Sequence, residues 1–229
     1  AEMTRTIILR MIKMAELRDP KETGGHVNRV ASYAVEIYDT WATKKGIPKE
    51  QIEKNKDLLR IAAMLHDVGK VAISDAILKK PARLTPEEYE IMKQHTYLGA
   101  RLFADKHSDF DETAYIVALN HHEKWDGTGY PGYINPETGK PLPGYETADG
   151  KAQPKKGEEI HPFGRIVALC DVYDALSSKR VYKSAWNEED VLAEIKKDSG
   201  KHFDPEMVEA FLFSLDVIKS ISERYPDES

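Results

Sequence analysis

The residues of this sequence best suited to chemistry are histidines that lie beside acidic side chains. The clearest are two adjacent pairs, His66-Asp67 and His121-His122, together with Asp171. Imidazole and carboxylate groups are ligands that iron, manganese, zinc, cobalt and nickel accept in proteins, whereas a structural zinc site would call for thiolates. The pattern therefore predicts a transition-metal site.

The adjacent pairs indicate more than one metal ion. Neighbouring residues of a helix point about 100° apart, so a single ion rarely takes both side chains of such a pair. Two neighbouring ions can do so if a carboxylate such as Asp67 bridges them while His66 binds only one. Two such pairs on different helices predict a multinuclear site inside a helical bundle.

The elements that position these residues are expected to be helices. Between residues 26 and 45, for example, apolar side chains recur every three or four positions and mark one face of a helix. Predicted helices cover 4–18, 26–45, 50–67 (ended by Gly69), 111–123 and 163–178, and others begin after the capping residues Thr85, Asn187 and Asp204. No segment alternates with the period of a strand, so we expect an all-α fold, a compact multi-helix bundle.

Residues 126–160 are the exception to this pattern. They hold seven of the 14 glycines and five of the 12 prolines, and they show no helical spacing. Irregular segments of this length inside a domain are usually functional or mobile. We therefore predict a long loop here.

Composition narrows the classes of function. A chain of 229 residues can bury a substantial core, and a net charge of −6 offers no general surface for DNA, RNA or an acidic membrane. No apolar run approaches the roughly 20 residues that cross a bilayer. The single cysteine, Cys170, is expected in the core and fits a reducing compartment. We expect a cytoplasmic protein whose anionic ligand is attracted locally, by metals or a few basic residues.

Two motifs carry a resemblance to a known family. Residues 66–70, HDVGK, resemble the HD-x-G-K signature of the HD superfamily of metal phosphohydrolases. Residues 121–131, HHEKWDGTGYP, resemble the HHE…GYP signature that names the HD-GYP family. The similarity runs from about Arg18 to Pro205, most of the chain. It implies an HD-domain-like helical bundle and hydrolysis of cyclic di-GMP.

The resemblance also implies a set of metal ligands. Carried over position by position, these are His26, His66, Asp67, His95, His121, His122 and Asp171. They would hold two or three divalent ions, iron or manganese first, with zinc, cobalt and nickel as alternatives. Glu22 would support the third ion, although its place before Thr23-Gly24 also fits a solvated turn.

Other positions are implied in catalysis and substrate binding. Asp67 would bridge the metals, and Lys70 would assist at the scissile phosphate. Arg180 and Lys183 would bind the nucleotide. Two further residues have open roles. Tyr130 could stack on a guanine base or pin the loop, and Asp174 could orient a ligand or pair with Arg180.

The sequence departs from the family between the second motif, which ends at Pro131, and the predicted helix 163–178. Twenty-four additional residues, 133–156, precede a Gly-Glu-Glu-Ile stretch, and we expect them to form a loop or lid at the mouth of the site. Residues 1–17 would be an N-terminal helix linked to an upstream domain, and residues 18–229 the catalytic domain. An upstream sensory or receiver domain and a dimer are both compatible with this organisation.

The expected reaction is attack of metal-activated water on cyclic di-GMP, giving the linear dinucleotide pGpG and further GMP. Two alternatives stay open: hydrolysis of another cyclic dinucleotide such as cyclic GMP-AMP, and a catalytically weak module that senses the ligand. A module that has lost catalysis is expected to lack metal ligands, whereas every implied ligand is present here. This favours the enzyme.

Overall fold

Helices make up most of the protein in the computed structural model, which describes residues 2–19, 25–178 and 184–227. The first half of the chain contains α1 (Glu2–Arg18), α2 (His26–Lys44), α3 (Lys49–Met64), the 3-10 helix η1 (Val68–Ala72), α4 (Asp75–Leu78), α5 (Pro86–Lys93), α6 (His95–Arg101) and α7 (Asp109–Asn120). The second half contains β1 (Ile134–Asn135), β2 (Lys140–Pro141), the 3-10 helix η2 (Gly157–Glu159), α8 (Pro162–Ser177), α9 (Glu188–Lys197), α10 (Pro205–Phe213) and α11 (Leu215–Arg224).

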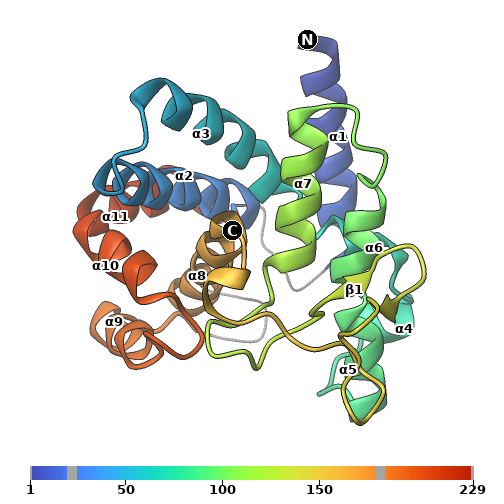
Figure 1. Cartoon of the computed structure of the whole chain (residues 1–229). Coiled ribbons are helices and arrows are strands. Elements are labelled where there is room, and N and C mark those ends of the chain that lie inside the picture. Colours follow the sequence, from blue (N-terminus) through green and yellow to red (C-terminus); the bar gives the residue numbers. More distant parts are fainter. Residues whose placement is uncertain (1, 20–24, 179–183, 228–229) are drawn as a thin grey trace.

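The core lies around α2, which packs against α3, α8, α10 and α11 (Figure 1). Its largest buried side chains include Tyr33, Tyr38, Leu169 and Phe211. Cys170 is a free thiol buried in this core, as expected. A smaller apolar cluster joins α1 to α2 and η1. On the other side of the molecule α6 packs against α7, α5 against α6, and α4 against α5. The predicted all-α bundle is confirmed.

Local sequence signals placed several helices correctly. α5 begins with a capping box, in which the Thr85 side chain accepts from the amide of Glu88 and the Glu88 side chain accepts from the amide of Thr85. The side chains of Asn187 and Asp204 cap α9 and α10 in the predicted way. None of the described helices is long and apolar enough to cross a membrane.

Two helices end earlier than expected. α3 stops at Met64 instead of residue 67, and α7 stops at Asn120 instead of residue 123. After Met64 the amides bond three residues back, as from Leu65 to the carbonyl of Ala62, which tightens the chain into a turn. Gly69 therefore does not end α3 but lies within η1. Both adjacent pairs, His66-Asp67 and His121-His122, consequently lie in turns that follow helices.

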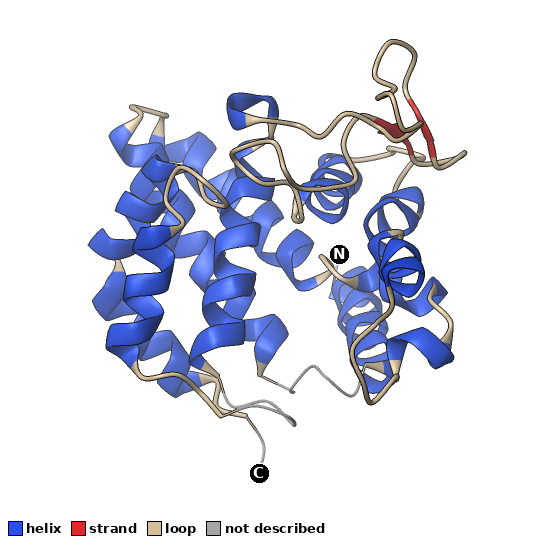
Figure 2. Cartoon of the chain, turned by 90° about the horizontal axis from the view of Figure 1, so that it is seen from below, coloured by secondary structure: helices blue, strands red, loops and turns tan. Residues whose placement is uncertain are grey.

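Two short strands, which no sequence pattern indicated, form within the predicted loop. β1 and β2 pair antiparallel, with Ile134 opposite Pro141 and Asn135 opposite Lys140. Figure 2 shows this hairpin at the edge of the helical bundle. The pairing was missed because two-residue strands carry no alternation to detect. The hairpin lies against α6, where Arg101 donates to the carbonyl of Pro136.

The glycine of the HDVGK motif allows η1 to contact α6. A Cβ atom at Gly69 would overlap the carbonyl oxygen of His95 and lie 2.5 Å from the amide nitrogen of Gly99. A Cβ atom at Gly99 would be 3.1 Å from the Gly69 nitrogen, a closeness that a small shift relieves. Only glycine at position 69 lets the two backbones approach this closely.

We expect Gly69→Ala to destabilise the protein, because overpacking a contact of this kind costs about 1–3 kcal/mol. Gly99→Ala is the matched variant and should cost clearly less. Urea denaturation followed by circular dichroism measures both free energies of unfolding. Equal stability of Gly69→Ala and the wild type would contradict this account of the contact.

Candidate metal centre

Two groups of four side chains form the candidate metal centre, and Asp67 belongs to both. One group contains His26, His66, Asp67 and Asp171, and the other contains Asp67, His95, His121 and His122. Within each group the potential ligand atoms lie within 4.8 Å of one another. The seven side chains come from the start of α2, the turn after α3, the start of α6, the end of α7 and the middle of α8. Among the described residues the structure thus brings together every histidine and aspartate predicted as a ligand.

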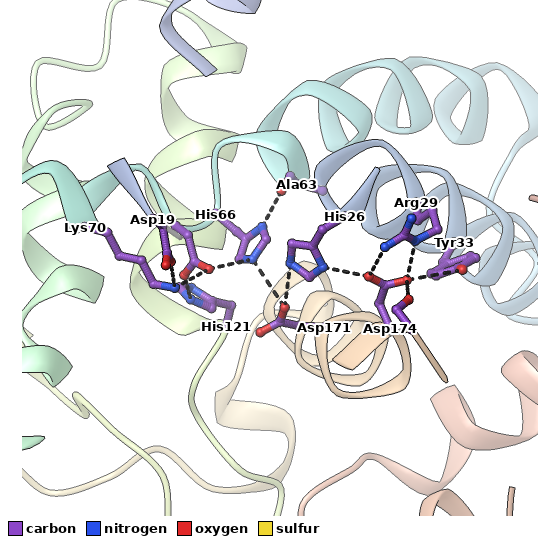
Figure 3. Close-up of polar contacts among 12 residues, drawn as sticks. Asp19, His26, Arg29, Tyr33, Ala63, His66, Lys70, His121, Asp171 and Asp174 are labelled. Carbon is purple, nitrogen blue, oxygen red and sulfur yellow. Dashed lines mark hydrogen bonds and ion pairs between the residues drawn. The ribbon is translucent and has the colours of Figure 1, made fainter. Parts of the chain in front are cut away.

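The carboxylate of Asp67 lies between the two groups. One of its oxygens, Oδ1, is 3.2 Å from Nε2 of both His95 and His121, and the other, Oδ2, is 3.2 Å from Nε2 of His66. Within the first group, Asp171 Oδ1 lies 3.1 Å from His26 Nε2 (Figure 3). Each oxygen of Asp67 therefore serves a different group, as a carboxylate bridging two ions would.

Three of the histidines are oriented by the helices that precede them. The Nδ1 atoms of His66, His95 and His121 lie 2.7, 2.6 and 3.0 Å from the carbonyl oxygens three residues earlier. These carbonyls belong to the last turns of α3, α5 and α7, where the helix itself supplies no partner. Because Nδ1 must donate to a carbonyl, the lone pair is left on Nε2, the atom that faces Asp67.

The buried Nε2 atom of His66 is a polar atom that the described protein leaves unsatisfied. It is near Asp67 and Asp171 but makes no hydrogen bond of acceptable geometry with any described residue. A buried polar atom without a partner is costly, so such atoms usually mark a function. A cation at this position would give Nε2 its missing partner, and the histidine and carboxylate donors fit a transition metal.

The electrostatics of both groups favour a bound cation. Although burial opposes its ionisation, His66 and Lys70 hold the pKa of Asp67 well below its usual value. Burial also acts on His66, yet the negative charges of Asp67 and Asp171 raise its pKa well above the ordinary one. Burial lowers the pKa of His122, helped by His121, and leaves that ring neutral. The two carboxylates thus favour positive charge at His66, where a bound metal ion would replace the proton, and His122 is already in the neutral state that metals bind.

Comparison with known proteins supports this interpretation. Residues 23–176 match the model of the HD domain. The chain belongs to the HD domain family. This confirms the resemblance drawn from the two motifs, and divalent metal binding is the property that the family and the two groups share.

Relatives of this HD domain are larger proteins. The chain is 39% identical over 225 residues to a cyclic di-GMP phosphodiesterase of Vibrio cholerae, covering 96% of the chain and 41% of that protein. It is 34% identical to a 3'3'-cGAMP-specific phosphodiesterase of the same organism, covering 99% of the chain and 38% of the relative. An HDG"Y"P protein of Bdellovibrio bacteriovorus has a similar fold, with a TM-score of 0.53, 20% identity, and coverage of 86% of this chain and 54% of that one. The chain thus spans about half the length of these relatives, or less.

Other predicted residues fall in three places. Lys70 lies beside the metal centre, with Nζ 3.3 Å from Asp67 Oδ2. Tyr130 stacks on His122 with ring centroids 4.9 Å apart, so it contacts a predicted ligand directly. Glu22, Arg180 and Lys183 lie outside the described residues, and their roles stay predictions. Among the described histidines, the remaining three, His107, His161 and His202, belong to neither group.

Asp174 contacts His26, a member of the first ligand group, on the ring nitrogen that faces away from Asp171. Its buried carboxylate lies 2.7 Å from His26 Nδ1 and accepts from Arg29 Nε, also at 2.7 Å. The expected role in orienting a ligand thus has a contact to support it, and Arg29 is the pairing partner seen here. Arg29 also reaches Asp227 near the C-terminus. Sequence reasoning missed this arginine, although its place one turn after His26 was a signal.

Glu123, which the sequence analysis did not single out, holds both ends of the segment 133–156, predicted to be an insertion. One carboxylate oxygen accepts from the amide of Gly132 at 2.9 Å, and the other accepts from the amide of Lys155 at 3.2 Å. The side chain is 1% exposed, and its burial raises its pKa. Its position directly after the histidine pair fastens the segment next to the metal centre.

The shared carboxylate leads to a prediction about metal content. Asp67→Ala should lose ions from both groups, whereas His95→Ala should lose about one ion per chain, since it belongs to one group only. Inductively coupled plasma mass spectrometry of dialysed protein measures the stoichiometry. His107→Ala, an exposed histidine outside both groups, is the control and should keep the wild-type content. Equal losses in Asp67→Ala and His95→Ala would argue against a shared ligand.

Asp174 gives a prediction about stability and pH. Asp174→Asn should cost about 3 kcal/mol at neutral pH, because it removes the buried carboxylate that pairs with Arg29 Nε. Although burial opposes it, bonds from His26 and Arg29 lower the pKa of Asp174 below its usual 3.8. The carboxylate's contribution is therefore complete above about pH 4 and is lost as the pH falls through the lowered pKa. Urea titrations should show the two proteins converging in stability only at acidic pH.

Proposed function

We propose that this chain hydrolyses a phosphodiester bond of cyclic di-GMP, releasing linear pGpG, with GMP as a further product. The observation that carries the proposal is the pair of ligand groups joined through Asp67. Two ions held a few ångströms apart suit the displacement of an oxygen at phosphorus. Relatives named for cyclic di-GMP and for 3'3'-cGAMP hydrolysis support a cyclic dinucleotide as the substrate class.

When bound, divalent ions would lower the pKa of a water molecule towards neutrality and offset charge developing on the phosphate. We propose two or three divalent ions, iron or manganese first and zinc, cobalt or nickel as alternatives, since imidazole and carboxylate donors suit all five metals. Neither group includes a thiolate, and the single cysteine, Cys170, is buried in the core. Glu22 remains the proposed additional ligand for a third ion.

We propose that Lys70 acts on the phosphate. Its amine lies beside Asp67 at the metal centre, and its side chain is 20% exposed, so a ligand can approach it. An ammonium there would bind a phosphate oxygen through a charge-assisted hydrogen bond. Arg180 and Lys183 are proposed to hold the second phosphate of the dinucleotide, and Tyr130 to border the site on the side of His122.

Two observations bear on the alternatives. The relative specific for 3'3'-cGAMP matches 99% of the chain, so the second base of the substrate is a separate question from the reaction. A sensor without catalysis would not need both ligand groups, yet both are complete among the described residues. We therefore place hydrolysis ahead of sensing and cyclic di-GMP ahead of cyclic GMP-AMP.

The proposal predicts turnover by protein purified anaerobically and supplied with iron or manganese. Liquid chromatography should show loss of cyclic di-GMP and appearance of pGpG, and a chelator should stop the reaction until metal is restored. Lys70→Met should lower kcat by roughly ten- to hundredfold, the worth of a lost charge-assisted hydrogen bond, while metal content stays unchanged.

The same assay with cyclic GMP-AMP decides between substrates. Faster hydrolysis of that dinucleotide would reassign the substrate and leave the reaction class intact. Tight binding of both dinucleotides without hydrolysis by the fully metallated chain would replace the enzyme with the sensor.

A further inference from the structure

Two consecutive residues at the end of α1 hold the segment that carries Lys70. Asp19 is 5% exposed, and its Oδ2 atom lies 2.9 Å from Lys70 Nζ. The same amine is 3.3 Å from Asp67 Oδ2. Lys70 therefore bridges two carboxylates, one inside the candidate metal centre and one outside it. Asp19 is the nearer of the two.

Arg18 binds the far end of the same segment. Its guanidinium donates to the carbonyl oxygens of Val71 and Ile73, the second at 3.2 Å, and to the carboxylate of Asp75 at 2.8 Å. Val71 lies in η1 and Ile73 directly follows it, where carbonyls lack partners within the helix. Side chains from two neighbouring positions thus fix both the backbone of η1 and the lysine that projects from it.

α1 is itself packed on this region. Ile12 is buried against Val27, Leu65 and Val68. A cavity of about 40 Å³ lies below the helix, lined both by residues of α1 and by His26, His66, Asp67 and Lys70. The last turns of α1 and the residue that follows it therefore border the metal centre on this side. From this position the Asp19 side chain contacts Lys70.

We infer that Asp19 is the positioning residue for Lys70 in the proposed reaction. A lysine has a long flexible stem, and holding its amine at one point costs conformational entropy. Without Asp19, the amine would be drawn towards Asp67 and would neutralise the group that both ligand sets share. Asp19 offers a closer carboxylate that belongs to neither ligand group, so Lys70 stays beside Asp67 and Asp67 stays available to the ions.

The inference rests on the proposed function for its kinetic test. Asp19→Asn, which keeps the shape and removes the charge, should lower kcat by roughly ten- to hundredfold, with KM and metal content unchanged. In a Lys70→Met background the same change should have no further effect, because the residue that Asp19 positions is gone. Asp75→Asn is the control: it removes an exposed contact of Arg18, leaves Asp19 and Lys70 intact, and should keep wild-type kcat.

A second measurement is independent of turnover. Acetic anhydride modifies free amines, and mass spectrometry reports the rate at each lysine. In Asp19→Asn, Lys70 should react several-fold faster than in the wild type, relative to the exposed Lys151. Absence of turnover in the wild type would sink the proposed function, and the labelling rates would still decide the inference.

Three results would overturn the inference. In the first, Asp19→Asn and Lys70→Met lower kcat by factors that multiply in the double variant, so the residues act independently. In the second, Lys70 is labelled at the same rate in Asp19→Asn and in the wild type. A loss of metal in Asp19→Asn would likewise assign its effect to the metal centre and not to Lys70.

Discussion

The contacts of one buried carboxylate, that of Asp67, constrain the arrangement of the surrounding helices. Its oxygens lie 3.2 Å from the Nε2 atoms of His66, His95 and His121, which come from three different parts of the chain. Such distances require α6 and the end of α7 to approach the turn after α3 closely. The close backbone contact at Gly69 makes that approach sterically feasible. Packing of apolar helices elsewhere supplies stability, but the relative positions of η1, α6 and α7 follow from what must surround Asp67.

The ends of helices contribute to the centre as much as the side chains do. His66, His95 and His121 each use Nδ1 to satisfy a carbonyl in the last turn of the preceding helix. The C-terminus of a helix carries partial negative charge, so three such termini meeting at one place favour cations there. The same hydrogen bonds fix the tautomer of each ring. The fold therefore supplies both the field and the orientation that a metal ligand needs.

Much of this could be predicted from the sequence, because helical periodicity, capping residues and the paired ligands are local signals. The helices expected to reach residues 67 and 123 end three residues earlier. At these ends the rings of His66 and His121 bond to carbonyls of the last helical turn. The spacing of apolar residues carries no signal of such a bond. Glu123 and Asp19 were missed because their partners lie far along the chain or are backbone amides. The hairpin at 134–141 was missed because two-residue strands have no period.

The bonds of Glu123 have a consequence for how this domain can vary. Both ends of the segment 133–156 are fixed by one carboxylate, through the amides of Gly132 and Lys155. With its ends fixed together, a loop's entropy depends only weakly on its length, about 0.6 kcal/mol for each doubling. The segment between these amides is thus a position where length and sequence can change during evolution at small cost to the metal centre. Changes confined to this segment would alter the border of the candidate metal centre and leave its ligands in place.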